Sequence, residues 1–357
     1  MNMKSKKRNY SLFLAACLAT SVLLGACEDW TEIESLDINT PSLQETNPQL
    51  YEDYLKDLNT YKGGNHKLVM VSVDNVADPS KQAERLTALP DSVDYISLNN
   101  PDNLSAAMVA DFDKVRAKGM KVVYTINFAE FEETWKDMQK ADPSLTEEDA
   151  VAYLNQRTED MLALTDKYNF DGIIADYTGR SLVSLKGEEL EQYSNRQANF
   201  FNLLKTWKEK IGKSLLFYGN VQYLTADNIS LTGMFDYLIL KTALSSNGGD
   251  LTLKALLAVQ AGKDVFGDES NPVPTDRFIA CVQLPKADDK DQIIGYWNSL
   301  NELGEKMLAT EGAAWWNIQA SENFERKGMF IMNVQADYYN DTFASVREVI
   351  QIMNPSK

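Results

Sequence analysis

The sequence predicts a single (β/α)8 barrel, because short apolar runs alternate with longer helical patterns along most of its 357 residues. The runs with the length and composition of buried strands are 67–74, 95–99, 121–127, 172–178, 214–220, 237–242, 277–284 and 313–319. Helical periodicity occurs at 104–118, 146–168, 189–211, 251–261, 290–309 and 342–353. Eight such units in roughly 250 to 300 residues fit a closed barrel better than the alternative, an open α/β sheet.

The first 26 residues have the features of a bacterial export signal. Four basic residues near the start precede an apolar run at 11–24, and small residues then lead to Cys27. This order predicts a lipoprotein signal peptide over 1–26 that is removed, leaving Cys27 as the lipid-bearing first residue. An uncleaved anchor helix would also imply export, although the run is shorter than the roughly 20 residues that a spanning helix needs.

The segment that follows predicts an acidic tether and then the folded domain. Residues 27–46 are polar and acidic and have no apolar period, whereas 47–357 carries the strand and helix pattern. Asn47 as a cap and Pro48 at the first helical position predict a helix over 47–61. Acidic residues beside a lipid-bearing cysteine resemble the surface-export signals of glycan-foraging Gram-negative bacteria. We therefore expect a lipid-anchored outer-membrane protein, facing the cell surface.

Composition favours a neutral ligand and a large apolar core. The net charge is −17, and removal of the four cations in the signal would make it about −21. A field of this sign repels nucleic acid and anionic lipid head groups, so we expect no nucleic-acid partner and membrane contact only through the lipid. The hydrophobic fraction of 44% suffices for one large core.

Few residues are available for metal or nucleophilic chemistry. Cys17 lies in the signal and Cys27 takes the lipid, so Cys281, inside an apolar strand, is expected to pack rather than to react. The single histidine, His66, excludes a histidine cluster for zinc, and a Ser-His-Asp triad would have to use it. No phosphate-binding or calcium-binding loop pattern is present, and we expect no cofactor or metal.

The fourth predicted strand carries the most informative motif, Asp-Gly-Ile-Ile-Ala-Asp-Tyr-Thr, which begins at Asp171. Alternate strand residues face one side, so Ile174, Asp176 and Thr178 point together into the barrel or its mouth. The motif resembles the D-G-x-D-x-D-x-E strand of glycoside hydrolase family 18, the chitinases and endo-β-N-acetylglucosaminidases. Asp171, Gly172 and Asp176 match it. Ile174 replaces the middle aspartate, and Thr178 stands where the family has its proton-donating glutamate.

The resemblance implies a substrate-assisted reaction, in which the acetamido group of the sugar attacks the anomeric carbon. Asp176 could hold that acetamido group. Thr178 cannot protonate the leaving oxygen near pH 7, and loss of a positioned general acid typically costs roughly 10² to 10⁴ in rate.

The leading hypothesis is therefore a catalytically inactive lipoprotein that binds N-acetylglucosamine-containing glycans, such as the N-glycan core or chitin fragments, for glycan-uptake proteins of the outer membrane. The alternative is an active endo-β-N-acetylglucosaminidase whose acid is displaced to Glu130 or Asp74. A third reading is a structural or protein-interaction lipoprotein with a vestigial cleft.

Ligands meet the carboxyl ends of barrel strands, so the residues there are the binding candidates. Those expected to bind sugar hydroxyls are Asn127, Tyr177, Tyr218, Asn220 and Gln283. Lys241 is expected to bond a hydroxyl, to pair with Asp176 or to lie solvated at the rim. The resemblance also places a tryptophan on the eighth strand, as the floor beneath the N-acetylated sugar. Adjacent strand residues face opposite sides, so one of Trp315 and Trp316 would be this floor, and we favour Trp316.

Overall fold

The computed structural model describes residues 43–285 and 290–355. The chain divides into two compact units, Met1–Glu52 and Asp53–Lys357. The predicted tether ends in α2 (Leu43–Thr46). The next helix, α3 (Pro48–Gly63), includes the division between the units and begins after Asn47, whose Oδ1 accepts a hydrogen bond from Leu50 N at 3.1 Å. The predicted signal peptide and Cys27 lie outside the described residues. No helix within those residues is long and apolar enough to cross a membrane.

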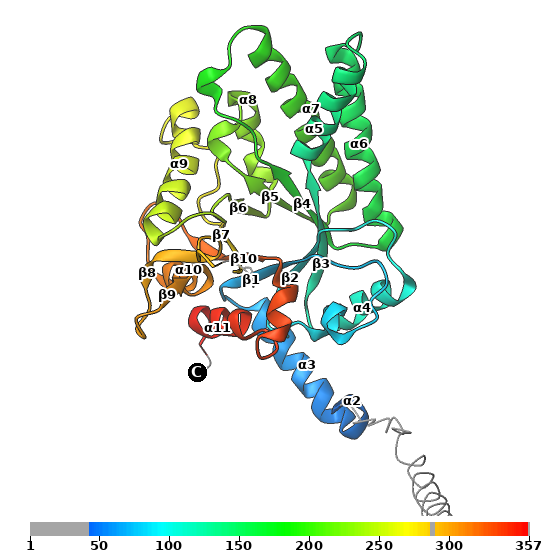
Figure 1. The fold of residues 1–357 in the computed structure, drawn as a ribbon, viewed down its shortest axis with the longest axis vertical. Helices are drawn as coiled ribbons and strands as arrows, with labels where there is room; N and C mark the ends of the chain where they lie inside the picture. The colour runs from blue at the N-terminus through cyan, green and yellow to red at the C-terminus, as the bar shows by residue number, and fades with distance from the viewer. Residues whose placement is uncertain (1–42, 286–289, 356–357) are drawn as a thin grey trace, which may run out of the picture. The chain divides into compact units, whose positions relative to one another are not determined.

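The second unit contains a closed parallel barrel, which confirms the predicted fold class (Figure 1). Its strands follow the order β1-β10-β7-β6-β5-β4-β3-β2 around the barrel. They are β1 (Leu68–Val73), β2 (Tyr95–Leu98), β3 (Lys121–Asn127), β4 (Gly172–Tyr177), β5 (Ser214–Gly219), β6 (Tyr237–Leu240), β7 (Phe278–Gln283) and β10 (Arg326–Met332). The first seven agree with the predicted runs to within a few residues at each end.

Helices surround the barrel, and α5, α6 and α7 lie side by side (Figure 1). The helices of this unit are α4 (Ala106–Ala117), α5 (Phe128–Ala141), α6 (Glu147–Tyr168), α7 (Glu188–Ile211), α8 (Ala226–Ile229), α9 (Gly248–Phe266), α10 (Ala309–Ile318) and α11 (Ala344–Met353). Those predicted at 104–118, 146–168, 189–211, 251–261 and 342–353 are confirmed, whereas α5 was not predicted.

The end of the barrel corrects the prediction. Residues 313–319 were expected to form the eighth strand but belong mostly to α10. The helix expected at 290–309 is instead an antiparallel hairpin of β8 (Tyr296–Leu300) and β9 (Lys306–Leu308). The eighth barrel strand is β10. A short apolar run does not distinguish a buried helix from a strand by periodicity, and the alanines of 309–314 favour the helix.

The barrel interior is packed by alternate strand residues, as the period of two requires. One buried cluster fills it and includes Met70, Val123, Ile174, Leu216 and Phe330. The outward-facing residues form a second, larger cluster with the helices. Ile174, at the position of the family's middle aspartate, is therefore part of the apolar filling of the barrel.

One arrangement of an aspartate recurs at the amino ends of the even-numbered strands β2, β4 and β6. The three residues are Asp94, Asp171 and Asp236. Each carboxylate accepts a backbone N–H from the preceding strand at 2.8 to 2.9 Å, the donors being Val69, Val122 and Leu215. Each also contacts a basic side chain, respectively His66, Arg116 and Lys208. Asp171, the first residue of the motif, thus ties neighbouring strands together at the end of the barrel opposite to the ligand-binding end.

Candidate functional site

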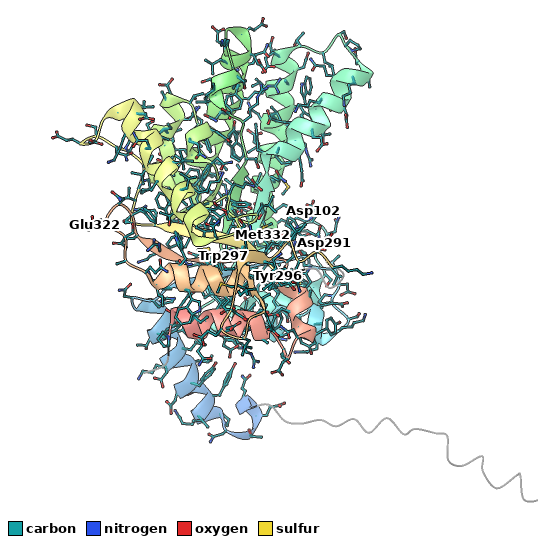
Figure 2. The ribbon with its side chains drawn as sticks, turned by 60° about the vertical axis from the view of Figure 1, so that its left-hand side comes forward. Asp102, Asp291, Tyr296, Trp297, Glu322 and Met332 are labelled. Carbon is teal, nitrogen blue, oxygen red and sulfur yellow. The ribbon has the colours of Figure 1, made fainter. Side chains whose placement is uncertain are left out.

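A pocket of about 610 Å³ opens at the carboxyl ends of the strands. This volume lies in the range of small-ligand sites. From the strand ends it is lined by Thr178, Tyr218, Asn220, Lys241, Gln283 and Met332, the last labelled in Figure 2. From the segment that follows β6 it is lined by Ala243, Leu244, Ser245, Asp250, Leu253 and Lys254. We call it the barrel-mouth pocket.

Asp176, near the end of β4, is only 8% exposed and is held by two side chains of this pocket. Lys241 Nζ lies 2.6 Å from Asp176 Oδ1, and Thr178 Oγ1 lies 3.4 Å from the same oxygen. Of the roles considered for Lys241, the structure shows the pairing with Asp176. Asp176 itself does not line the pocket, whereas both of its partners do. A ligand would therefore meet Lys241 before it met the carboxylate.

Burial raises the pKa of Asp176 above the ordinary carboxyl value. The attraction of Lys241 and its hydrogen bond act in the opposite direction, as does the hydrogen bond from Thr178. The negative charge of Glu130 adds to the rise. Desolvation outweighs the pairing, so the fold holds this carboxylate at an energetic cost, which is typical of functional sites.

The ring of Tyr218 forms the floor beneath the lysine. Lys241 Nζ lies 3.6 Å from the ring centroid, because β5 runs between β4 and β6. The Cys281 thiol donates to Tyr218 Oη at 3.5 Å, and the tyrosine hydroxyl donates to Met332 Sδ at 3.7 Å. Burial raises the pKa of Cys281 to about 12, so the thiol is a packing group and no nucleophile at neutral pH.

The predicted amides lie on both sides of Asp176. Asn127 pairs with Asp176 in the β3–β4 register, and its Nδ2 donates to Glu130 Oε1 at 2.8 Å. Asn220, after β5, donates to the backbone oxygen of Thr178 at 3.2 Å. Gln283 lines the pocket from β7. The structure thus places Asn220, Gln283, Tyr218 and Lys241 at one pocket, whereas Asn127 lies beside Asp176 and does not line it.

Asp74, the other displaced acid considered, accepts a hydrogen bond from Asn100 Nδ2 at 2.8 Å. Its backbone N–H donates to Gln335. The charge of Glu130 acts on Asp176, so the structure favours Glu130 over Asp74 as a neighbour of the site.

Two groups of predicted site residues lie elsewhere. Tyr177 faces the helices, where its ring packs at 5.4 Å from Phe201 and 5.5 Å from Phe128, because strand residues on either side of Asp176 must point outward. Trp315 and Trp316 lie on α10 rather than on a barrel strand, so neither is the floor of the barrel. Met332 of β10 occupies the mouth instead.

Sequence reasoning missed Met332 and the wall contributed by residues 243–254. A signal for Met332 existed, since the four residues after Gly328, Met329 to Met332, form a short apolar run of the kind typical of a buried strand. The residues of this wall form no recognisable motif. They line the pocket only because the chain passes beside it after β6.

Comparisons with known proteins agree with this architecture. The sequence profile of the family described as glycoside hydrolase family 18, BT1044-like, matches residues 31–352. No curated protein matches the sequence. A selenomethionine BT1044 variant with a glutamate-to-glutamine substitution is 16% identical, with a TM-score of 0.60 over 88% of this chain and 97% of that one.

Two further solved structures are similar. An endo-β-N-acetylglucosaminidase from Cordyceps militaris is 15% identical, with a TM-score of 0.54 over 85% of this chain and 96% of the other. The C-terminal domain of a putative chitinase from Desulfitobacterium hafniense is 13% identical, with a TM-score of 0.52 over 81% and 100%. At such identities the structures show the fold, whereas the profile match shows the family. The chain belongs to glycoside hydrolase family 18, among its BT1044-like members.

Proposed function

We propose that this chain is a non-hydrolytic family 18 protein that binds N-acetylated glycans at the barrel mouth. The observation that carries the proposal is the Thr178 hydroxyl, which bonds to Asp176 at the position of the family's proton-donating glutamate. A threonine hydroxyl has no proton to give near neutral pH. Ile174 removes the second carboxyl of the motif. The strand therefore retains a polar anchor without a general acid.

Lys241 supplies the pocket with a positioned donor. An ammonium group has three N–H donors, and the bond to Asp176 uses one. The remaining donors suit the hydroxyls of a sugar or the oxygen of its acetamido group. Because Asp176 and the face of Tyr218 hold the lysine in place, little side-chain freedom is lost when a ligand arrives. Asn220 and Gln283 add amides that pair with hydroxyls.

The class of ligand is supported by the family and by the names of the similar structures, which include an endo-β-N-acetylglucosaminidase and a putative chitinase. We extend the proposal to a lipid anchor at Cys27, an outer-membrane location facing the surface, and delivery of the glycan to uptake proteins. The order of basic residues, apolar run and Cys27 supports the anchor. Labelling of cells with an alkyne fatty acid should mark the wild-type protein and leave Cys27→Ala unmarked.

Calorimetric titration with N-acetylglucosamine oligomers and released N-glycans, followed by product analysis after long incubation, tests the binding function. We expect binding without cleavage, and a weaker affinity for Lys241→Met. Lys140→Met is the matched control, because Lys140 forms an exposed ion pair with Asp137 on α5. We further expect Thr178→Glu to introduce slow cleavage of a chitobiose-linked substrate. Cleavage by the wild-type protein would overturn the proposal.

One observation favours a second function, an active endo-β-N-acetylglucosaminidase that uses Glu130 as its acid. Glu130 lies in the first turn of α5, which follows β3 directly. Its carboxylate accepts a hydrogen bond from Asn127, and its charge acts on Asp176. An enzyme of this kind would cleave as wild type and as Thr178→Ala. Its turnover would vanish in Glu130→Gln and in Asp176→Asn. These four proteins, assayed side by side, separate the two functions.

A further inference from the structure

A second pocket, of about 520 Å³, is formed by the first turn of α9, the β8–β9 hairpin and α10. Three tryptophans line it: Trp297 from β8, and Trp315 and Trp316 from α10. It shares no lining residue with the barrel-mouth pocket. The two pockets border the same stretch of chain, since residues 243–245 line one and residues 247–249 line the other. We call it the tryptophan pocket.

Trp316 is a fixed part of the wall. Its Nε1 donates to Thr252 Oγ1 of α9 at 2.9 Å, and the guanidinium of Arg326 lies 4.5 Å from the centre of its ring. Phe324 stacks against it, with ring centroids 6.1 Å apart. These contacts use the indole N–H and leave the side chain 2% exposed. Trp316 therefore shapes the pocket and is not available as a platform for a ligand.

Trp297, labelled in Figure 2, packs against Gly312 of α10. A Cβ added to Gly312 would overlap the indole. Trp297 is 6% exposed, and its Nε1 has no hydrogen-bond partner among the described residues. The atoms of Trp297 nearest to Gly312 and Gly248, which also line the pocket, are ring carbons. Trp297 therefore gives the pocket an apolar wall.

Trp315 provides the flat surface. It is 49% exposed, whereas the other two tryptophans of the pocket are buried. An indole face of this kind suits the C–H face of a pyranose ring. Asn247, Ser299 and Gln319 also line the pocket and offer amides and a hydroxyl for the ring hydroxyls.

The lining residues that the structure describes include no charged side chain, whereas the barrel-mouth pocket includes Lys241, Asp250 and Lys254. An ionic ligand would lose its hydration in the tryptophan pocket without gaining a counter-charge. We infer that the tryptophan pocket is a second binding site, which takes a neutral pyranose unit of an oligosaccharide and does so independently of the barrel mouth.

Indole N–H resonances of ¹⁵N-labelled protein test this site directly. The signals of Trp297 and Trp315 are assigned with the variants Trp297→Phe and Trp315→Phe. The probes are cellohexaose, maltohexaose and N-acetylchitotetraose, each at millimolar concentration. We expect at least one probe to shift both signals. Trp315→Ala should weaken that binding about tenfold, the equivalent of one stacking contact, and Trp315→Tyr should restore most of it.

Two control variants distinguish binding at this site from binding at the barrel mouth and from the effect of removing any exposed aromatic side chain. Tyr339→Ala removes an aromatic residue that is 76% exposed and lines neither pocket, and it should leave the shifts unchanged. Lys241→Met should weaken binding at the barrel mouth and spare the shifts of Trp297 and Trp315. The inference is overturned if no probe moves the two signals, or if Trp315→Ala binds as the wild type does. Neither result bears on the barrel-mouth proposal, which is tested separately by the calorimetric titration.

Discussion

Lys241 Nζ lies 2.6 Å from Asp176 Oδ1, so the carboxylate that β4 keeps at the barrel mouth is paired with a lysine. In the family motif the neighbours of this carboxylate are two further acids, and here they are Ile174 and Thr178. Lys241 offers hydrogen-bond donors to a neutral ligand, whereas the positions of the two family acids on β4 and directly after it carry no carboxyl group.

Lys241→Met should destabilise the protein in a pH-dependent way. Without the lysine, the pKa of Asp176, already raised by burial, should rise further. At pH 7 an unpaired and largely buried carboxylate should lower the free energy of unfolding by about 3 kcal/mol. As the pH falls through the raised pKa the carboxyl becomes neutral, so the loss should shrink. Urea unfolding at a series of pH values measures this.

Lys140→Met is the control for this measurement, because the Lys140–Asp137 pair has a similar length of 2.7 Å but is solvent-exposed. Its loss should leave the free energy of unfolding nearly unchanged at every pH, because an exposed ion pair contributes little to stability. A Lys241→Met penalty that is equal at low and neutral pH would show that the lysine acts through packing rather than through its charge on Asp176.

Asp171 should prove to be a structural residue despite its place in the motif. Its carboxylate accepts from Arg116 Nε at 3.0 Å and from Val122 N at 2.8 Å. Asp171→Ala leaves both donors without their acceptor, so we expect a loss of about 1 to 3 kcal/mol in the free energy of unfolding. Asp113→Ala removes only an exposed partner of the same arginine, and should cost about 0.5 kcal/mol or less. Equal losses in chemical denaturation would contradict the assignment.

His66 should titrate above its ordinary pKa. The hydrogen bond to Asp94 at 3.0 Å raises the pKa of the imidazole, and this outweighs the lowering effect of burial. Because the folded state favours the protonated form, its contribution to stability is full below the unfolded pKa and is lost as pH rises through the folded one. As the pH rises from the ordinary histidine pKa through the raised pKa of folded His66, the fall in stability should therefore be larger in the wild type than in His66→Gln.

The sequence contains one histidine, so proton NMR of the untagged protein reports this pKa without assignment. Asp94→Asn should move the pKa of His66 down towards the ordinary value. A wild-type pKa at or below that value would remove the proposed link between this pair and the pH dependence of stability.

The parts of the fold that the sequence predicted are those encoded locally. The runs that became β1 to β7 are short and apolar, and Asp or Asn flanks several of them, as Asp171 precedes β4 and Asn127 ends β3. The eighth strand was misplaced because the Ala-Ala-Trp-Trp run before Asn317 is as apolar as a buried strand. Gly328 interrupts the true strand, where its missing side chain admits the backbone of Leu68.

In the candidate site too, the sequence predicted only the relationships between residues that are close together in the chain. The period of two brought Asp176 and Thr178 together, but it should also have excluded Tyr177, which faces the helices. Lys241 lies over the ring of Tyr218 and contacts Asp176 because β4, β5 and β6 are neighbours in the closed barrel. No local pattern encodes that relationship, so the lysine could be named as a candidate but its partner could not be fixed.

The two adjacent tryptophans should differ sharply in their contribution to stability. On α10, Trp316 is buried against Phe324 and donates to Thr252, whereas Trp315 is half exposed. Trp316→Ala should therefore lower the free energy of unfolding by about 3 to 5 kcal/mol. Trp315→Ala should cost no more than about 1 kcal/mol, as expected of a surface substitution.

Guanidinium unfolding of both variants, with Trp316→Phe as a partial replacement, measures the difference. Trp316→Phe keeps an aromatic ring against Phe324 but loses the bond to Thr252, so its loss should lie between those of the other two variants. Similar losses for Trp315→Ala and Trp316→Ala would mean that both indoles are buried, as on a barrel strand between core and helices. Trp315 would then have no exposed face, and the tryptophan pocket could not present it to a sugar.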